Sequence, residues 1–410
     1  MPDAYLVGER IAYHRKRLGL SQVEFAGLVG RSESWVSQVE RGVRSVDRMS
    51  VLQKVADVLS VPVSDLSGDD GDYPADAEDR PEAFDMIRAA LTGHPALSSL
   101  LGAGPPPRIS RRELDTLRDQ HARVWELVHG SRYAELAPLL AALITGLEMA
   151  TRAEGSDEIM HQARELLTDT YQATAAAMAK LGEGDAAWVA ADRAAITAEA
   201  LNSPLSVAAS MFRMGHVFLS LGQLAQAQQV AAATADALQP AVSAKDAKPE
   251  ELSLYGACHL VLAVAAARDN DRSQAHRHLD EARATGQRLG DDRDDYGTEF
   301  GPTNVAIHAV AIAVELGDAG HALDLAHGVD TSGLSPERQA RYLIDLAAAH
   351  AMRRQIGEAL HDLQEAERLT PEQTRTDRVA RAVARDLLQL SGLRPRPELR
   401  ELAERFGVLP

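Results

Sequence analysis

Cysteine and aromatic residues are scarce in this chain. Among its 410 residues the single cysteine is Cys258, so no disulfide can form within the chain, and we expect the reducing cytoplasm as its location. There are six Phe, three Trp and eight Tyr residues. Alanine and leucine are abundant instead, and because both have high helix propensities, the composition predicts an all-α protein.

Long apolar runs and catalytic signatures are also missing. No apolar run approaches the ~18 residues that cross a bilayer, and no secretory signal is visible, so we expect no membrane partner. No GxxxxGK[ST], GxSxG or HExxH pattern occurs, and no histidines show paired metal spacing. We therefore expect no enzyme, no cofactor and no metal site.

Positive charge is in short supply, and it is placed unevenly. The net charge is −17, but residues 1–66 hold nine Arg or Lys against eight Asp or Glu, a net of +1. An acidic surface repels phosphate, so any contact with nucleic acid must lie in residues 1–66.

One acidic run invites a calcium interpretation. Five carboxylates occur within nine residues, at Asp291, Asp292, Asp294, Asp295 and Glu299. The EF-hand spacing fails, because Tyr296 and Thr303 stand where oxygen ligands belong. We expect instead that Gly301 and Pro302 begin the next helix and that Phe300 packs across a helix junction.

Residues 6–66 show the spacing of five short helices. The first ends at Gly19, the fourth covers about residues 48–59, and a short fifth follows Pro62. The second helix is capped by Ser21, with Glu24 completing a capping box. Gly30 permits a left-handed turn, after which Ser32 caps a third helix with inward Val36 and Val39.

The chain then changes character twice. Residues 67–110 hold an acidic stretch, a short helical piece at 82–91 and breaks rich in Gly and Pro, which together predict a linker. From residue 111 to 410, long helical segments alternate with short turns. These turns recur at Gly182, Gly222, Asn270, Gly317 and Arg354, and each is followed five residues later by alanine. Such a repeat predicts stacked helix pairs in an α-solenoid.

Residues 20–42 resemble the helix-turn-helix of the phage-repressor-like (XRE-type) family of bacterial transcription regulators. The positions that carry the resemblance are Leu20, Ser21, Gln22, Glu24, Ala26, Gly30, Val36, Glu40, Arg41 and Gly42. It extends over residues 6–66 and implies that the second helix lies across the phosphates while the third enters the major groove of double-stranded operator DNA. It also implies a structural pair between Arg15 and Glu40.

Two groups of residues are predicted to contact DNA. Phosphate contacts are expected from the start of the second helix and the end of the third, at Ser21, Gln22, Arg41 and Arg44. Base contacts are expected from the outward side of the third helix, at Glu33, Ser34, Ser37 and Gln38. For Trp35 two interpretations stay open, a contact with DNA or cover for the domain's own surface. Because a net charge of +1 is small, we expect a homodimer with half-sites one turn apart, ~34 Å.

The helical body is similar to the tetratricopeptide-like regions found beside such heads in bacterial regulators, some of which sense peptides. The stretch 295–318 looks like a signature of regulators from high-GC bacteria. The similarity is one of architecture, so it transfers no ligand residues. It implies a body that dimerises and senses an effector.

The repeat register suggests where an effector would bind. The residues that stand nine and thirteen positions before each turn residue are four residues apart, so they lie on the same face of the helix. Their polar members are Asp169, Arg213, Asn304, His308, Arg341 and Asp345. We expect this face to line a concave surface that binds a short peptide or a small polar molecule. The alternative is a solvated face with internal pairs such as Arg341–Asp345.

These features predict a DNA-binding regulator with residues 1–66 as head, 67–110 as linker and 111–410 as regulatory and dimerisation body. Two alternatives stay open, a repeat scaffold for a protein partner and an antitoxin-like autorepressor.

Overall fold

The predicted all-α fold is confirmed. The computed structural model describes residues 4–17, 20–41, 44, 46, 49–59, 63, 66, 82–93, 109–153, 156–391 and 395–409. These residues contain no β-strand, and their one isolated β-bridge joins Arg293 to Phe300. The chain divides into two compact units, residues 1–80 and 81–410, which are described separately below.

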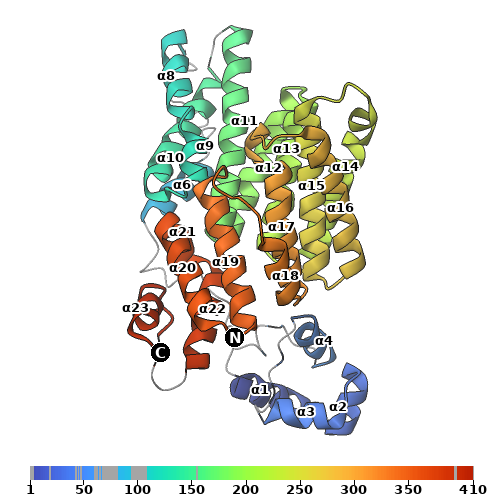
Figure 1. Cartoon of the computed structure of the whole chain (residues 1–410). Coiled ribbons are helices and arrows are strands. Elements are labelled where there is room, and N and C mark those ends of the chain that lie inside the picture. Colours follow the sequence, from blue (N-terminus) through green and yellow to red (C-terminus); the bar gives the residue numbers. More distant parts are fainter. Residues whose placement is uncertain are drawn as a thin grey trace. The chain divides into compact units, whose positions relative to one another are not determined.

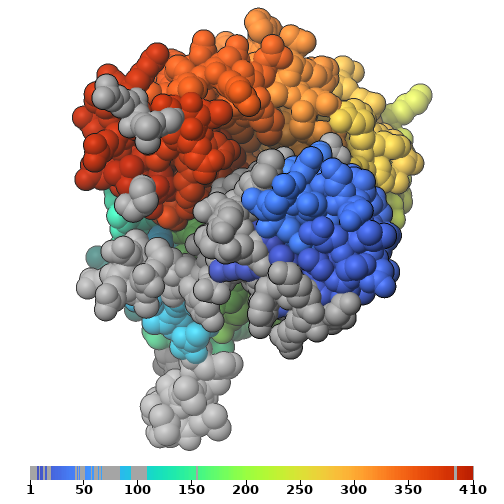
Figure 2. Space-filling view, turned by 90° about the horizontal axis from the view of Figure 1, so that it is seen from below, coloured from blue at the N-terminus to red at the C-terminus, as the bar shows by residue number. Residues whose placement is uncertain are grey.

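The first unit is a small helical domain. It contains α1 (Ala4–Arg17), α2 (Gln22–Val29), α3 (Glu33–Glu40) and α4 (Met49–Leu59), drawn in blue in the space-filling view of Figure 2. Its core includes Ile11, Phe25, Val36, Val55 and Leu66, none of them more than 1% exposed. Residues 67–81 and 94–108 of the predicted linker 67–110 lie outside the described residues, as does most of the predicted fifth helix.

The predicted caps of α2 and α3 are confirmed. The Oγ of Ser21 accepts from the backbone N of Glu24 at 3.2 Å, and the backbone N of Ser21 donates to Glu24 Oε2 at 2.8 Å. Gly30 ends α2 with a φ of 72°, a left-handed conformation that costs glycine little. Ser32 Oγ then accepts from the backbone N of Trp35 at 3.2 Å. The turn between the two helices is thus fixed by short-range contacts.

The short helix that we expected inside the linker, α6 (Glu82–Thr92), belongs to the second unit. Its apolar side chains Ile87 and Leu91 are each 2% exposed and share a core with α10. Arg88 Nη1 donates to Asp185 Oδ2 at 2.8 Å, which ties α6 to α12. Because its apolar side chains are buried against other helices, α6 is part of the packed second unit and not of a solvated linker.

The rest of the second unit is helical almost throughout (Figure 1). Three helices begin it: α8 (Arg111–His121), α9 (Val124–His129) and α10 (Tyr133–Ala150). Five helix pairs follow, and we call them the helix-pair array: α11 (Asp157–Lys180) and α12 (Gly184–Ala200), α13 (Pro204–Ser220) and α14 (Leu224–Ser243), α15 (Pro249–Arg268) and α16 (Arg272–Leu289), α17 (Pro302–Glu315) and α18 (Ala319–Ala326), and α19 (Pro336–Met352) and α20 (Ile356–Leu369). The last three helices are α21 (Pro371–Thr376), α22 (Arg378–Ser391) and α23 (Pro397–Arg405).

The predicted turn positions all adopt the left-handed conformation. The φ angles are 78° at Gly182, 69° at Gly222, 61° at Asn270, 79° at Gly317 and 60° at Arg354. The alanines five residues later are all 0% exposed: Ala187, Ala227, Ala275, Ala322 and Ala359. The small side chain lets the two helices of each pair approach closely. The repeat read from the sequence therefore marks a real structural unit.

The pairs stack in chain order, and the two ends of the second unit meet. The first helices α11, α13, α15, α17 and α19 each contact the next one along the array. Near α10, Ser131 Oγ donates to Gln373 Oε1 of α21 at 2.6 Å, and the backbone N of Ala134 donates to Glu372 Oε2 at 3.0 Å. Residues more than 230 positions apart in sequence are joined in this way.

Among the described helices, two, α10 and α15, are long and apolar enough to cross a membrane by length and composition. Neither is an uninterrupted apolar run, because polar residues occur in both. Both contribute fully buried core residues, such as Leu140 and Leu143 from α10 and Leu254 and Ala263 from α15. Packing within the second unit accounts for their apolar composition.

Candidate DNA interface and inner polar network

Helix α3 presents two different sides. Val36 and Val39 are each 1% exposed and lie in the core of the first unit. On the other side, Glu33 and Ser34 are exposed, and Ser37 and Gln38 are half-buried. The side chains predicted to reach base edges are therefore the accessible ones of this helix.

The predicted pair of Arg15 and Glu40 is present and buried. Arg15 Nη2 donates to Glu40 Oε2 at 2.9 Å, and Arg15 Nη1 donates to the carbonyl oxygen of Leu20 at 2.6 Å. The hydrogen bond to Glu40 raises the pKa of Arg15. Because α1, α3 and the start of α2 meet here, the pair sets the angle at which α3 leaves the core.

Gln22 belongs to the same network, which the sequence did not predict. Its Nε2 donates to Glu40 Oε2 at 2.8 Å, so the side chain expected on a phosphate is engaged inside the domain. Ser21 beside it is exposed. The predicted phosphate contact at this helix start therefore rests on Ser21 and the backbone, and the side chain of Gln22 has a structural partner.

The position of Trp35 favours the second of its two interpretations, cover within the domain. It is only 9% exposed and forms part of the core of the first unit. The guanidinium carbon of Arg31 lies 5.6 Å from the ring centroid. Arg31 is an exposed basic residue before α3 that was not among the predicted DNA contacts.

Two exposed arginines follow α3, as predicted. Arg41 Nε donates to the carbonyl oxygen of Ser37 at 3.0 Å, and the backbone N of Arg44 donates to the carbonyl oxygen of Gln38 at 3.2 Å. Both side chains are exposed. Positive charge thus flanks the accessible side of α3 at both ends, with Arg31 before it.

Comparison with known proteins agrees with this geometry. The helix-turn-helix domain family matches residues 6–67. The HTH-type transcriptional regulator SinR of Bacillus subtilis (strain 168) is 31% identical over 87 residues, which are 21% of this chain and 78% of that protein. SinR of Bacillus licheniformis is 30% identical over 86 residues, with the same coverage.

This chain belongs to the helix-turn-helix family of transcriptional regulators. The family relation covers the first unit and makes the protein a DNA-binding regulator. No solved structure matches the chain.

The six side chains predicted to line an open effector surface are not all accessible. Arg213 is 6% exposed, Asn304 is 2% exposed and Asp345 is 6% exposed. Asp345 faces Arg341, whose Nε lies 3.7 Å from its carboxylate. His308 Nδ1 lies 2.8 Å from the carbonyl oxygen of Asn304. Arg213, Asn304 and Asp345 are therefore covered, Arg213 by the backbone of Tyr296 and Gly297. Effector binding by this face stays a prediction.

Arg213 and Asp169 meet residues that the sequence did not connect with them. Arg213 Nη2 donates to the carbonyl oxygens of Tyr296 and Gly297 at 2.8 and 2.7 Å. Its guanidinium carbon lies 4.8 Å from the ring centroid of Trp125. Trp125 Nε1 in turn donates to Asp169 Oδ2 at 2.8 Å. These contacts link α9, α11 and α13 to the segment between α16 and α17.

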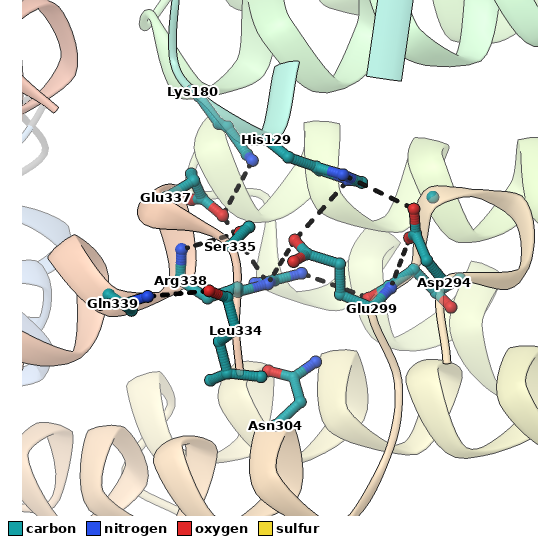
Figure 3. A network of polar contacts seen from close by, with 12 residues as sticks. His129, Lys180, Asp294, Glu299, Asn304, Leu334, Ser335, Glu337, Arg338 and Gln339 are labelled. Atoms are coloured by element: carbon teal, nitrogen blue, oxygen red, sulfur yellow. Dashed lines mark hydrogen bonds and ion pairs between the residues drawn. The ribbon is translucent and has the colours of Figure 1, made fainter. Parts of the chain in front are cut away.

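That segment, residues 294–299, is the centre of a polar network (Figure 3). A carboxylate oxygen of Glu299 lies 3.3 Å from Arg338 Nε and 3.6 Å from His129 Nε2. Lys180 Nζ lies 3.1 Å from Glu337 Oε2. We call the eight residues Trp125, His129, Lys180, Arg213, Asp294, Glu299, Glu337 and Arg338 the inner polar network.

Burial changes the charge state of this network. It lowers the pKa of His129 to about 4, against the attraction of Glu299. It raises the pKa of Asp294 to about 6, with repulsion from Glu299 adding to the effect. No sequence motif could reveal this network, because its members come from α9, α11, α13, α19 and an irregular segment.

Among the described residues, three buried polar atoms on first helices of the array have neither a hydrogen bond nor an ion-pair partner. They are Gln172 Oε1, Arg213 Nε and Asn304 Oδ1. All three residues are more than nine-tenths buried and belong to first helices of the array, α11, α13 and α17. An unsatisfied buried polar atom is energetically unfavourable, at ~1–3 kcal/mol each. They are one hydrogen-bond donor and two acceptors.

Proposed function

We propose that the regulator binds operator DNA as a homodimer through α3, and that the helix-pair array is a tetratricopeptide-like solenoid that receives an effector. One observation carries the DNA-binding part. Val36, Val39 and Glu40 hold α3 against the core, while Glu33, Ser34, Ser37 and Gln38 stay accessible on its other side.

The exposed chemistry suits base recognition. A glutamine amide pairs with adenine, a glutamate accepts from the amino group of cytosine, and serine tolerates several bases. Arg31, Arg41 and Arg44 can neutralise phosphates around the groove. Two heads are needed because residues 1–66 carry a net charge of only +1. A dimer would read half-sites about 34 Å apart.

The effector would act at Arg213 of the inner polar network and at the unsatisfied atoms of Gln172 and Asn304. A ligand that accepts from Arg213 Nε and donates to Gln172 or Asn304 combines acceptor and donor groups, as an amide or an amino acid does. The segment 294–299 contacts both α9 and α19, so a ligand that moves it would change how α9 meets α19 in the last pair of the array. Such a ligand shifts DNA affinity only if it binds the two arrangements unequally. We place the protein in the cytoplasm with its DNA.

Binding to selected DNA tests the first part. Duplexes enriched from random sequence by the full-length protein are measured by fluorescence anisotropy against a scrambled duplex at several salt concentrations. We expect the affinity for enriched DNA to fall steeply with salt, and Gln38→Ala to lose tenfold or more, ~1–3 kcal/mol per base contact. The matched control is Gln229→Ala, an exposed glutamine on α14. Equal loss in both variants, or no enrichment, contradicts the proposal.

The effector proposal has its own test. A dialysable fraction of cell extract is added to the DNA-binding assay, and the concentration that half-shifts the affinity is compared between variants. Arg213→Lys and Asn304→Ala should each require at least tenfold more extract, while Gln229→Ala should not. Unchanged responses in both inner variants refute this site without affecting the DNA-binding result.

A further inference from the structure

Two histidines from the two helices of one pair face each other in the array. His259 on α15 and His278 on α16 have their Nδ1 atoms 3.1 Å apart and their ring centroids 5.3 Å apart. Nitrogen ligands bind zinc at ~2.0–2.1 Å in a tetrahedron, which places two of them about 3.4 Å from each other. The observed spacing is within a few tenths of an ångström of this value, so a small rotation of the two rings and a tautomer change that moves the shared proton to Nε2 would make both Nδ1 atoms ligands of one ion.

Both rings have the neutral charge that metal binding requires. A histidine ligates through the lone pair of a neutral imidazole. Burial lowers the pKa of His259 to about 4, and His278 adds repulsion. Burial also lowers the pKa of His278. Near pH 7 the two rings are neutral. Without an ion, one ring carries its proton on Nδ1 and donates a hydrogen bond to the Nδ1 of the other ring.

The surroundings position the pair and supply negative charge. The ring centroid of Tyr255 lies 4.6 Å from that of His259, and the hydroxyl of Tyr255 lies 3.0 Å from Glu281 Oε1 and 2.7 Å from Gln239 Oε1. Glu281 on α16 and Asp236 on α14 attract the protonated form of His259, and Arg277 repels that of His278. Cys258 is fully buried, which raises the pKa of its thiol to about 12, so it is no ligand here.

We propose that His259 and His278 form a binding site for a divalent transition-metal ion that prefers imidazole, such as zinc, nickel or copper. In the described part of the chain no three His, Cys, Asp or Glu side chains are grouped to hold an ion. The protein therefore supplies two nitrogens, and water or a reoriented Glu281 carboxylate completes the shell. The bound ion joins α15 to α16 and stabilises the third helix pair. Imidazole ligands select against magnesium and calcium, which prefer oxygen.

Metal titration of the full-length protein tests the proposal. Zinc chloride is titrated by calorimetry after treatment with a chelator, and melting is followed with zinc, nickel, magnesium or calcium. We expect one zinc equivalent that raises the melting temperature, no effect of magnesium or calcium, and a loss of zinc affinity of tenfold or more in His278→Ala and His259→Ala. His276→Ala, an exposed histidine two residues earlier on α16, should keep wild-type affinity.

The result that overturns the proposal is equal zinc affinity in the wild type and in both pair variants. A variant with weakened packing is recognised by its melting temperature in chelator. If a variant is destabilised in this way, NMR of the wild type tests the site directly. Zinc must then shift the Nδ1 resonances of His259 and His278 and leave those of His276 unchanged. Shifts at His276 alone would also overturn it.

Discussion

Removing the Glu40 carboxylate should release α3 from the core of the head. Glu40 accepts hydrogen bonds from Arg15 and Gln22, and the side chains of Arg15 and Glu40 are 8% and 6% exposed. In Glu40→Ala the Arg15 guanidinium stays buried with the carbonyl oxygen of Leu20 as its remaining acceptor among these contacts. Breaking a buried ion pair by deleting one partner costs about 3–5 kcal/mol.

That loss is large for a domain of this size. A domain of about 60 residues, such as this head, has a free energy of unfolding of roughly 3–9 kcal/mol. Glu40→Ala should therefore unfold a substantial fraction of the head and abolish DNA binding. Glu40→Gln keeps an acceptor oxygen but loses the charge, so we expect about 1–2 kcal/mol. Glu33→Gln, an exposed acid on the same helix, should change stability by less than about 0.5 kcal/mol.

Hydrogen exchange resolved by peptide is the suitable assay, because it reports the head and the array separately in the full-length protein. The loss of protection in peptides from α1 and α3 should be largest in Glu40→Ala, smaller in Glu40→Gln and smallest in Glu33→Gln. Peptides from α15 should keep their protection in all three variants. A loss of less than about 1 kcal/mol in Glu40→Ala would refute the structural role assigned to the pair.

Three further predictions concern packing, backbone conformation and pH. Gly8→Ala places a Cβ against the backbone oxygen of Val39, so urea titration should show a head destabilised by about 1–3 kcal/mol, whereas Gly27→Ala, with open space around it, should be neutral or stabilising. Arg354 has a φ of 60°, a left-handed conformation that is unfavourable for a residue with a side chain, so Arg354→Gly should raise the melting temperature of the array slightly. A lower melting temperature would contradict backbone strain at this position. Burial lowers the pKa of His308 to about 4, below about 6.5 in the unfolded chain, so the unfolded state takes up a proton as the pH falls through this window and the folded state does not. Between pH 7 and 4, the free energy of unfolding of the wild type should therefore fall by up to about 3 kcal/mol more than that of His308→Gln. Equal losses in the two proteins would contradict this pKa.

Local signals in the sequence predicted local structure well. Ser21, Glu24 and Gly30 act within one turn of the helix they bound, so a few residues contain all the information needed. The same holds for the turn at Asn270, where a left-handed residue and a buried alanine five positions later repeat in each pair.

The side-chain environment of the candidate sites was harder to predict. Trp35 and Gln22 lie on helices whose positions were correct, but their partners come from other helices. The inner polar network combines α9, α11, α13 and α19 with the irregular segment 294–299. A repeat register gives the face of each helix, but it does not show that an inserted loop covers that face.

Recognition of particular DNA sequences by the accessible side of α3 is the property on which the proposed function depends. Genome-wide mapping of bound DNA in cells tests it, with the wild type and Gln38→Ala compared at equal protein levels. We expect wild-type peaks that share a motif of two half-sites about one helical turn apart, together with loss or redistribution of those peaks in the variant. Peaks without a shared motif, or identical maps for the two proteins, would contradict recognition through α3.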